Sequence, residues 1–477
     1  MRLDLHSSQI KGLSEYEAPG LNKVIDVFNA HEGGNITKNR YYEGKISVAE
    51  VNLGIALPES IKKLEIGCAW GAKCVDVLAA RSMFDGFVGI NGEDVEDLDR
   101  IVVDNNLIAE YIKACRDELK YGCTFATLSR DDDIGVKIRF HSPQTAAALW
   151  NGEKGRIDCG IAIIDSVRDE KDHDKWIPSI VNYYTDDAIW VLIRVNNDFW
   201  NALYFPHDMK RPLMEPLIWN ATSNKPFGRS RIKEPIRRLI QGYVRTIANA
   251  TIGLEFATSP QKYLLGITDE QFDVVINQKF KQYVGSIIAA TANPETGQNP
   301  TFGQLMQGNI SPHVEMIRIL ATQFSAATGL TVTDTGVVSE ANPTSADAVL
   351  AQSQTLIAMA EQLNVGNGDA LRNIALMAQA IKAQIPLDSL SEGQRDVMAH
   401  FKNPAMPSVA ATTDAAIKIV SARPEFASTD TFLEMIGFDK ASIRKVKAEE
   451  SRARGLAVLE ELEEVTENEA NTPEEVE

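Results

Sequence analysis

The residues that could do chemistry are few and scattered along this chain. The best metal-like string is residues 169–174 (DEKDHD), which includes His173. It lies between two strand-like runs, so a solvated turn is favoured over a metal site. Residues 131–133 (DDD) lack the alternate spacing and the distal Glu of a calcium loop. Neither string predicts a metal centre.

The motifs of the common enzyme classes are absent from the sequence. There is no GxxxxGK[ST] loop, no GxGxxG after a strand, no HExxH helix and no GxSxG elbow. The 7 histidines are scattered, and the 5 cysteines form no CxxC pair. Irregularly spaced cysteines in an odd number are typical of reduced, buried thiols. We therefore expect a non-catalytic chain with no cofactor and no metal, although residue order alone leaves a Ser-His-Asp triad open.

Binding of anions is the chemistry with the strongest signal. Between Lys210 and Arg245 there are 9 Lys/Arg and 2 Glu, a local charge of +7 in a chain of net charge −18. Apolar residues recur at helical spacing through the same stretch, so one face should pack while the basic face meets water, a partner subunit or a polyanion. The cations expected on that face are Arg229, Arg231, Lys233, Arg237, Arg238 and Arg245.

The opposite signal follows later in the chain. No Lys or Arg lies between Arg318 and Arg372, whereas Asp334, Glu340, Asp347, Glu361 and Asp369 do. Contacts from Lys and Arg to phosphates dominate affinity for nucleic acid, so this stretch cannot grip DNA. If this stretch lined a channel, its acidic residues would repel a DNA duplex over a screening distance of about 8 Å at physiological salt. The alternative is that these residues simply pack between neighbouring helices.

The elements that position these residues indicate an α+β fold. A helix with an apolar face from Leu21 to Phe28 should end at Gly33-Gly34, and a second helix should span 105–121, capped by Asp104 or Asn105. β-rich runs separated by turns predict an antiparallel sheet block. These runs are residues 124–129, 136–141, 160–167, 177–184 and 188–195.

Helices dominate the second half of the sequence. One is expected from about 230 to 255 with Ser230 as its cap, and another from 313 to 327 with Val314, Ile317, Leu320, Ala321 and Phe324 on its apolar face. A long helix from 345 to 384 should kink or break at 366–368 (GNG). Nine Glu after Leu459, with no Lys or Arg, predict a disordered acidic tail, which serves as a solubiliser or binds a partner.

In several short pieces the sequence resembles the portal proteins of tailed bacteriophages, the siphophage-type head-to-tail connectors. The resemblance covers roughly residues 35–450 and is loose after 405 and at 67–69. The pieces fall in the family's order at 39–44 (NRYYEG), 53–56 (LGIA), 75–81 (VDVLAAR) with Trp70 before it and 85–87 (DGF) after it, 226–240 (PFGRSRIKEPIRRLI), 254–266 (LEFATSPQKYLLG), 310–313 (ISPH), 326–330 (AATGL) and 342–348 (NPTSADA).

The resemblance implies a portal fold with an α/β wing, a helical stem, a small mixed clip, a long kinked helix and a helical crown. The implied boundaries are wing 1–228, stem helix 229–256, clip 257–309, second stem helix 310–329, channel loop 330–344, wing helix and return 345–411, crown 412–464 and acidic tail 465–477. The implied channel-loop residues are Thr331, Thr333, Asp334, Thr335, Val337, Glu340 and Asn342.

The resemblance also implies a function and a set of partners. About twelve copies would form a ring at one capsid vertex, passing double-stranded DNA non-specifically in packaging and ejection. The ring would dock the terminase large subunit, a head-completion or adaptor protein, the major capsid protein and scaffolding protein. The basic stem start would contact a neighbouring subunit rather than DNA phosphates. The alternatives are another structural head or adaptor protein, or a subunit of a DNA-packaging enzyme.

Composition sets the remaining expectations. A chain of 477 residues, 44% hydrophobic and 24% charged, should form two to four subdomains of a soluble protein. No apolar run approaches the roughly 20 residues that span a bilayer, and the N-terminus has no targeting pattern. We expect no membrane partner. The resemblance to portal proteins implies a location in the virion after assembly in the host cytoplasm.

Overall fold

The computed structural model covers the chain in two compact units, each described by itself. One unit comprises residues 1–342 and 355–401, and the other comprises 343–354 and 402–477. The residues that the structure describes are 2–51, 65–90, 96–169, 172, 176–196, 199–258, 262–266, 297, 299, 301–304, 309–337, 346–405, 409–438 and 440–470.

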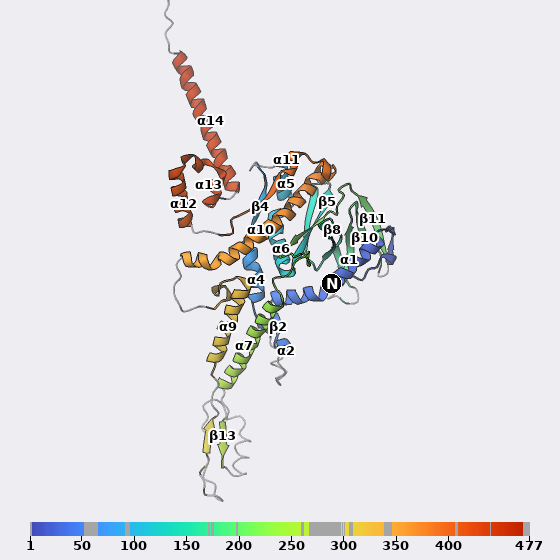
Figure 1. Cartoon of the computed structure of the whole chain (residues 1–477), viewed down its shortest axis with the longest axis vertical. Coiled ribbons are helices and arrows are strands. Elements are labelled where there is room, and N and C mark those ends of the chain that lie inside the picture. Colours follow the sequence, from blue (N-terminus) through green and yellow to red (C-terminus); the bar gives the residue numbers. More distant parts are fainter. Residues whose placement is uncertain are drawn as a thin grey trace, which may run out of the picture. The chain divides into compact units, whose positions relative to one another are not determined.

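The first unit begins with a mixed sheet that is covered by one long helix (Figure 1). The six strands run in the order β1-β11-β10-β9-β8-β7, antiparallel except where β1 joins β11. Helix α1 (Ala18–Tyr42) buries Leu21, Val24, Ile25 and Phe28 against this sheet. The strands are β1 (Ile10–Lys11), β7 (Ala146–Asn151), β8 (Arg156–Arg168), β9 (Trp176–Tyr184), β10 (Ala188–Arg194) and β11 (Trp200–Pro206).

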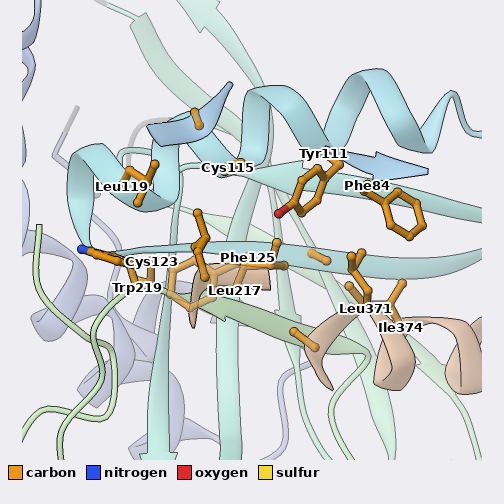
Figure 2. Packing of buried hydrophobic residues seen from close by; sticks show 14 of the residues in the cluster. Phe84, Tyr111, Cys115, Leu119, Cys123, Phe125, Leu217, Trp219, Leu371 and Ile374 are labelled. Atoms are coloured by element: carbon orange, nitrogen blue, oxygen red, sulfur yellow. The ribbon is translucent and has the colours of Figure 1, made fainter. Parts of the chain in front are cut away.

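A second sheet and four helices complete the main core. The antiparallel order is β12-β5-β6. In Figure 2, Tyr111 and Leu119 point from α6 toward this sheet, and Leu371 and Ile374 approach from α10. The elements are α4 (Trp70–Ala79), α5 (Glu96–Asp104), α6 (Leu107–Tyr121), β5 (Cys123–Asp131), β6 (Gly135–His141), β12 (Met214–Ile218) and α10 (Ala346–Ala383).

Two helices leave this core side by side (Figure 1). They are α7 (Glu234–Thr258) and α9 (Ser311–Thr328), and a short antiparallel pair, β13 (Lys262–Leu265) with β14 (Thr301–Gln304), lies between them in the sequence. The remaining short elements are β2 (Lys45–Ser47), α2 (Val48–Val51), β3 (Glu65–Gly67), β4 (Phe84–Gly89), α11 (Glu392–Arg395) and β15 (Val397–Phe401). Of these, α2 and β3 contact α7, and β4 pairs with β15.

The second unit is helical where it is described. Its elements are α12 (Val409–Ala422), α13 (Asp430–Met435), α14 (Lys440–Ala470) and the first residues of α10. The structure therefore agrees with an α+β fold and with helices at both predicted stem positions. Most of the predicted clip, 257–309, lies outside the described residues.

Several predicted boundaries are wrong. Helix α1 runs through Gly33-Gly34 to Tyr42, because Asn35 is buried and donates a hydrogen bond of 3.0 Å to the Pro143 carbonyl. Helix α14 reaches Ala470, so the prediction that residues 465–470 are disordered is wrong. The N-cap of α6 is Asn106, because the Asn105 side chain bonds Val136 and Ile138 of β6 instead. The sequence patterns also missed β7, β11 and β12.

The predicted interruption at 366–368 is also absent, since α10 is one continuous helix across it. A Cβ on Gly366 would lie 3.9 Å from the Ile218 carbonyl oxygen, and one on Gly368 would lie 3.7 Å from the Phe401 ring. Both are ordinary van der Waals distances, so the packing around α10 would also accept an alanine at either position.

Candidate channel and subunit-contact surfaces

Trp70 is the wedge that joins the two stem helices to the main core. It is the first residue of α4 and is 4% exposed. Its ring centroid lies 4.5 Å from that of Tyr243 on α7 and 4.8 Å from that of Phe324 on α9. Aromatic pairs at this spacing stabilise a contact beyond their buried area. The wedge therefore sets the position at which both helices leave the core.

The helices also approach each other closely. A Cβ added to Gly242 of α7 would lie 3.1 Å from a methyl carbon of Leu320 on α9, which is tighter than an ordinary contact. The side chains of α9 that are buried are Leu320, Ala321, Phe324 and Thr328. Glycine at this position thus allows α7 and α9 to pack as a pair.

Arg231 lies inside the subunit, contrary to the prediction that it contacts a neighbour. It is 8% exposed. Its Nε donates to the Cys74 carbonyl at 2.5 Å, and its Nη2 donates to the Thr328 carbonyl at 2.7 Å. Thr328 ends α9, where unpaired carbonyls and the helix dipole favour a positive charge. Arg231 therefore caps α9 and ties it to α4.

The other predicted cations are more accessible. Arg229 and Lys233 are exposed, and Arg238 is exposed and pairs with Glu234 on the next turn, Nη2 to Oε1, at 3.2 Å. Arg237 is half-buried, with its guanidinium 5.9 Å from the Tyr41 ring centroid, and Arg245 is also half-buried. Ser230 precedes α7 by four residues and its Oγ accepts from Ile232 N at 2.9 Å, so it caps the entry turn rather than the helix.

The predicted channel loop begins as a compact turn. The Asp334 carboxylate accepts hydrogen bonds from both the backbone N and the hydroxyl of Thr331, each at 2.9 Å. Residues Thr333–Thr335 form one turn of 3-10 helix, which ends at Gly336 with φ 81°. The indole Nε1 of Trp70 donates to the Thr335 carbonyl at 3.1 Å. The start of the loop is therefore fixed to the base of the stem.

The predicted loop residues differ in their exposure. Thr333 is exposed, whereas Thr331, Asp334 and Thr335 are half-buried. Val337 is half-buried and packs in part against the main hydrophobic core, and its role as a channel-lining residue stays a prediction. Glu340 and Asn342 lie outside the described residues.

The outer side of α9, meaning its solvent-exposed surface, carries apolar residues that the described chain covers only in part. Val314 and Ile319 are each 45% exposed, and Met316 is 40% exposed. Val314 lies two turns before Ala321 on the predicted apolar face, but it is exposed there because the buried residues of that face begin only at Leu320. Beyond Arg318 the exposed residues of α9 are uncharged, namely Ile319, Thr322, Gln323, Ala326 and Ala327.

The stretch without Lys or Arg divides into two parts. From Leu356 onward α10 packs one face into the main core, which matches the packing alternative for that part. Glu361 and Asp369 are exposed on its other face. The remaining part, the outer side of α9 and the turn at 331–336, stays a surface without cations.

A buried polar network on α6 and α10 was missed by sequence reasoning. The Asn367 amide donates to Tyr111 Oη at 2.9 Å and to Glu118 Oε2 at 2.8 Å. Tyr111 also lies 2.6 Å from Ser82 Oγ. Burial raises the pKa of Glu118 to about 8, so this carboxyl holds a proton at neutral pH. An Asn between two glycines is the one sequence signal of this network.

Groups that could hold a metal ion, namely three or more His, Cys, Asp or Glu side chains, do not occur among the described residues. The 5 cysteines are free and buried, as predicted. In the part of the chain that the structure describes, no helix combines the length and apolarity needed to cross a bilayer. Residues 170, 171, 173 and 174 of the metal-like string lie outside that part.

Comparisons with known proteins give the following. No protein-family model matches the chain, and no curated protein is similar to it. Among solved structures, a chain from "Virion of native gene transfer agent (GTA) particle" aligns at 11% identity and TM-score 0.45, covering 77% of this chain and 89% of that one. A chain from "Neck of native GTA particle computed with C12 symmetry" gives the same values. A likeness at this level does not carry a function from those particles to this chain.

Proposed function

We propose that this chain is the subunit of a portal ring of a tailed bacteriophage. The ring would stand at one capsid vertex and pass double-stranded DNA during packaging and ejection. It would assemble in the host cytoplasm and remain in the virion. The terminase large subunit, a head-completion or adaptor protein, the capsid protein and scaffolding protein are its proposed partners.

The observation that carries the proposal is the α7–α9 pair, whose exposed apolar residues have no contact with a second subunit in the single chain. Each helix packs one face on the other and on Trp70, and α9 leaves Val314, Met316 and Ile319 to solvent in a single subunit. Exposed apolar residues grouped on one element are typical of interaction surfaces. A neighbouring copy would cover them, and head-to-tail repetition of one contact closes a ring.

The mechanism in this proposal is geometric and electrostatic, with no reaction. The outer side of α9 beyond Arg318 and the turn at 331–336 carry no Lys or Arg. A channel lined by such surfaces offers phosphates no cationic contact. DNA would therefore slide without deep binding minima, while the cations at the start of α7 remain available for contacts between subunits.

The test is native mass spectrometry of the purified full chain at several concentrations. The proposal expects one closed oligomer of about twelve copies that persists on dilution. A monomer at all concentrations, or an open ladder of sizes, would overturn it. A monomer that hydrolyses ATP would favour the packaging-enzyme alternative instead.

A further inference from the structure

A cavity of about 860 Å³ is lined by residues of α1 and by the segment that leads into α7. Its walls come from the C-terminal half of α1, the starts of β5 and β7, and the segment from Lys225 to Arg237. We name it the basic cavity. It lies entirely within the first compact unit.

The charge of the basic cavity is opposite to that of the chain. Its lining includes 5 Lys/Arg side chains and 1 Glu, a formal charge of +4, whereas the whole chain carries −18. The one carboxylate, Glu234, already pairs with Arg238, which is not part of the lining. The five cations of the lining are Lys38, Lys225, Arg229, Lys233 and Arg237. None of them forms an ion pair with another residue that the structure describes.

Lys38 is the most enclosed of these cations. Its Nζ donates to the Tyr121 carbonyl at 2.9 Å and to Asn35 Oδ1 at 3.4 Å, so both partners are neutral. Burial, with Arg237 nearby, lowers the pKa of Lys38. Burial and Lys38 together lower the pKa of His31 in the same lining. An anion in the cavity would relieve this repulsion.

Most of the remaining lining is apolar. Phe28, Phe125 and Phe227 contribute rings, and residues 146–148 contribute alanine methyl groups. A cavity of this size is in the range of about 300–1,000 Å³ that holds ligands much larger than one phosphate or carboxylate group. The occupant should therefore combine negative charge with apolar side chains, which describes an acidic peptide segment better than a nucleic-acid backbone.

We propose that the basic cavity receives a carboxylate-bearing segment of a second copy of this chain. The proposal rests on the ring described above and identifies one of its contact sites. Outside the cavity the chain carries −22, so a second copy supplies many carboxylates. Lys233 directly precedes α7, and Arg237 lies on the first turn of that helix. The neighbouring helix α9 exposes apolar residues on the same unit.

The first experiment is zero-length carbodiimide cross-linking of the assembled protein, prepared from equal parts of ¹⁵N-labelled and unlabelled chains. We expect mixed-isotope peptide pairs that join Lys38, Lys225 or Lys233 to an Asp or Glu. The control is Lys113, an exposed lysine that pairs with Glu110 of its own helix, Nζ to Oε1, at 2.6 Å. Assembled protein whose cavity lysines give only same-isotope pairs would overturn the inference.

The second experiment reverses charge at the cavity. The double variant Lys225→Glu/Lys233→Glu should raise the concentration for half-assembly at least about tenfold, because like charges across an interface repel strongly. The control Arg100→Glu/Lys113→Glu makes the same change in net charge on exposed helices elsewhere. It should shift that concentration less than about twofold, since exposed single pairs contribute little.

The outcomes separate the two proposals. Closed rings without cavity cross-links, and with equal effects of both double variants, overturn the cavity assignment and leave the portal proposal standing. Absence of any oligomer from the unmodified chain overturns both. Inorganic phosphate at 10 mM serves as the probe for a free anion. If phosphate leaves the concentration for half-assembly unchanged and the cross-links remain, a peptide occupant is supported. If phosphate abolishes the cross-links while assembly is unchanged, the assignment of a peptide occupant is overturned.

Discussion

The indole N–H of Trp70 donates a hydrogen bond of 3.1 Å to the carbonyl oxygen of Thr335, 265 residues later in the sequence. The same ring packs on Tyr243 and Phe324. One side chain thus joins α4, both stem helices and the turn that opens the predicted channel loop. Through Trp70 the core of the subunit therefore contacts both α7 and α9 and the start of the predicted channel loop.

Removing the Trp70 ring should loosen this junction. Trp70→Ala is expected to lower the free energy of unfolding by about 3–5 kcal/mol, because a large buried ring leaves a cavity. Trp70→Phe keeps most of the packing and loses the hydrogen bond, at about 1 kcal/mol. Urea unfolding of both variants measures the difference, and equal stability of the two would argue against the wedge.

Replacing Arg231 should destabilise the subunit itself. Arg231→Met leaves the Thr328 and Cys74 carbonyls without their charged donor, so we expect a loss of about 2–4 kcal/mol. Arg229→Met is the matched control on the exposed side and should change stability by less than about 0.5 kcal/mol. If thermal melts show that Arg229→Met lowers the melting temperature more than Arg231→Met, the assignment of Arg231 to the interior of the subunit is contradicted.

Glu118 should make stability depend on pH. Burial raises the pKa of this carboxyl to about 8, above its ordinary value of 4.5. Between these values the folded state holds a proton that the unfolded state releases, so stability falls as pH rises, by about 1.4 kcal/mol per pH unit. Glu118→Gln keeps an acceptor for Asn367 and removes the titration.

The check is the unfolding free energy of both proteins from pH 5 to pH 8. The wild type should lose stability relative to Glu118→Gln across this range. Parallel curves would mean that Glu118 is ionised in the folded protein.

Charging the outer side of α9 should block assembly without unfolding the subunit. The double variant Val314→Asp/Ile319→Asp places carboxylates in the proposed contact, where their burial is costly. Val103→Asp is the control, because Val103 is 71% exposed on α5. Sedimentation velocity should find the double variant monomeric with an unchanged melting temperature and the control still assembled. An assembled double variant would place the contact elsewhere.

Reversing Arg237 and Arg238 tests the basic start of α7. Replacing both with Glu should prevent ring assembly, since neither is buried and Arg237 lines the basic cavity. Negative-stain images of the variant and of wild type provide the measurement. Intact rings with altered DNA release would instead support a contact with phosphates.

Sequence reasoning succeeded where a local pattern decides the structure. The apolar period from Ile232 onward predicts α7, and Gly329 predicts the end of α9, because amphipathic spacing and a left-handed stop are local signals. Those signals required no knowledge of other parts of the chain.

It failed where distant residues decide. Arg231 reads as one more cation of a basic face, yet Cys74 and Thr328 bury it. Gly366 and Gly368 predict a helix break, yet α10 continues through both residues. Neither the wedge at Trp70 nor the network at Glu118 has a periodic signature, because each is assembled by tertiary packing.

The most direct test of the central claim is a cryo-electron microscopy reconstruction of the purified full chain. The account predicts a closed ring with a central channel, with Val314, Met316 and Ile319 covered by the neighbouring copy and the turn at 331–336 facing the channel. Particles without a central hole would contradict it, as would rings in which the outer side of α9 remains exposed to solvent.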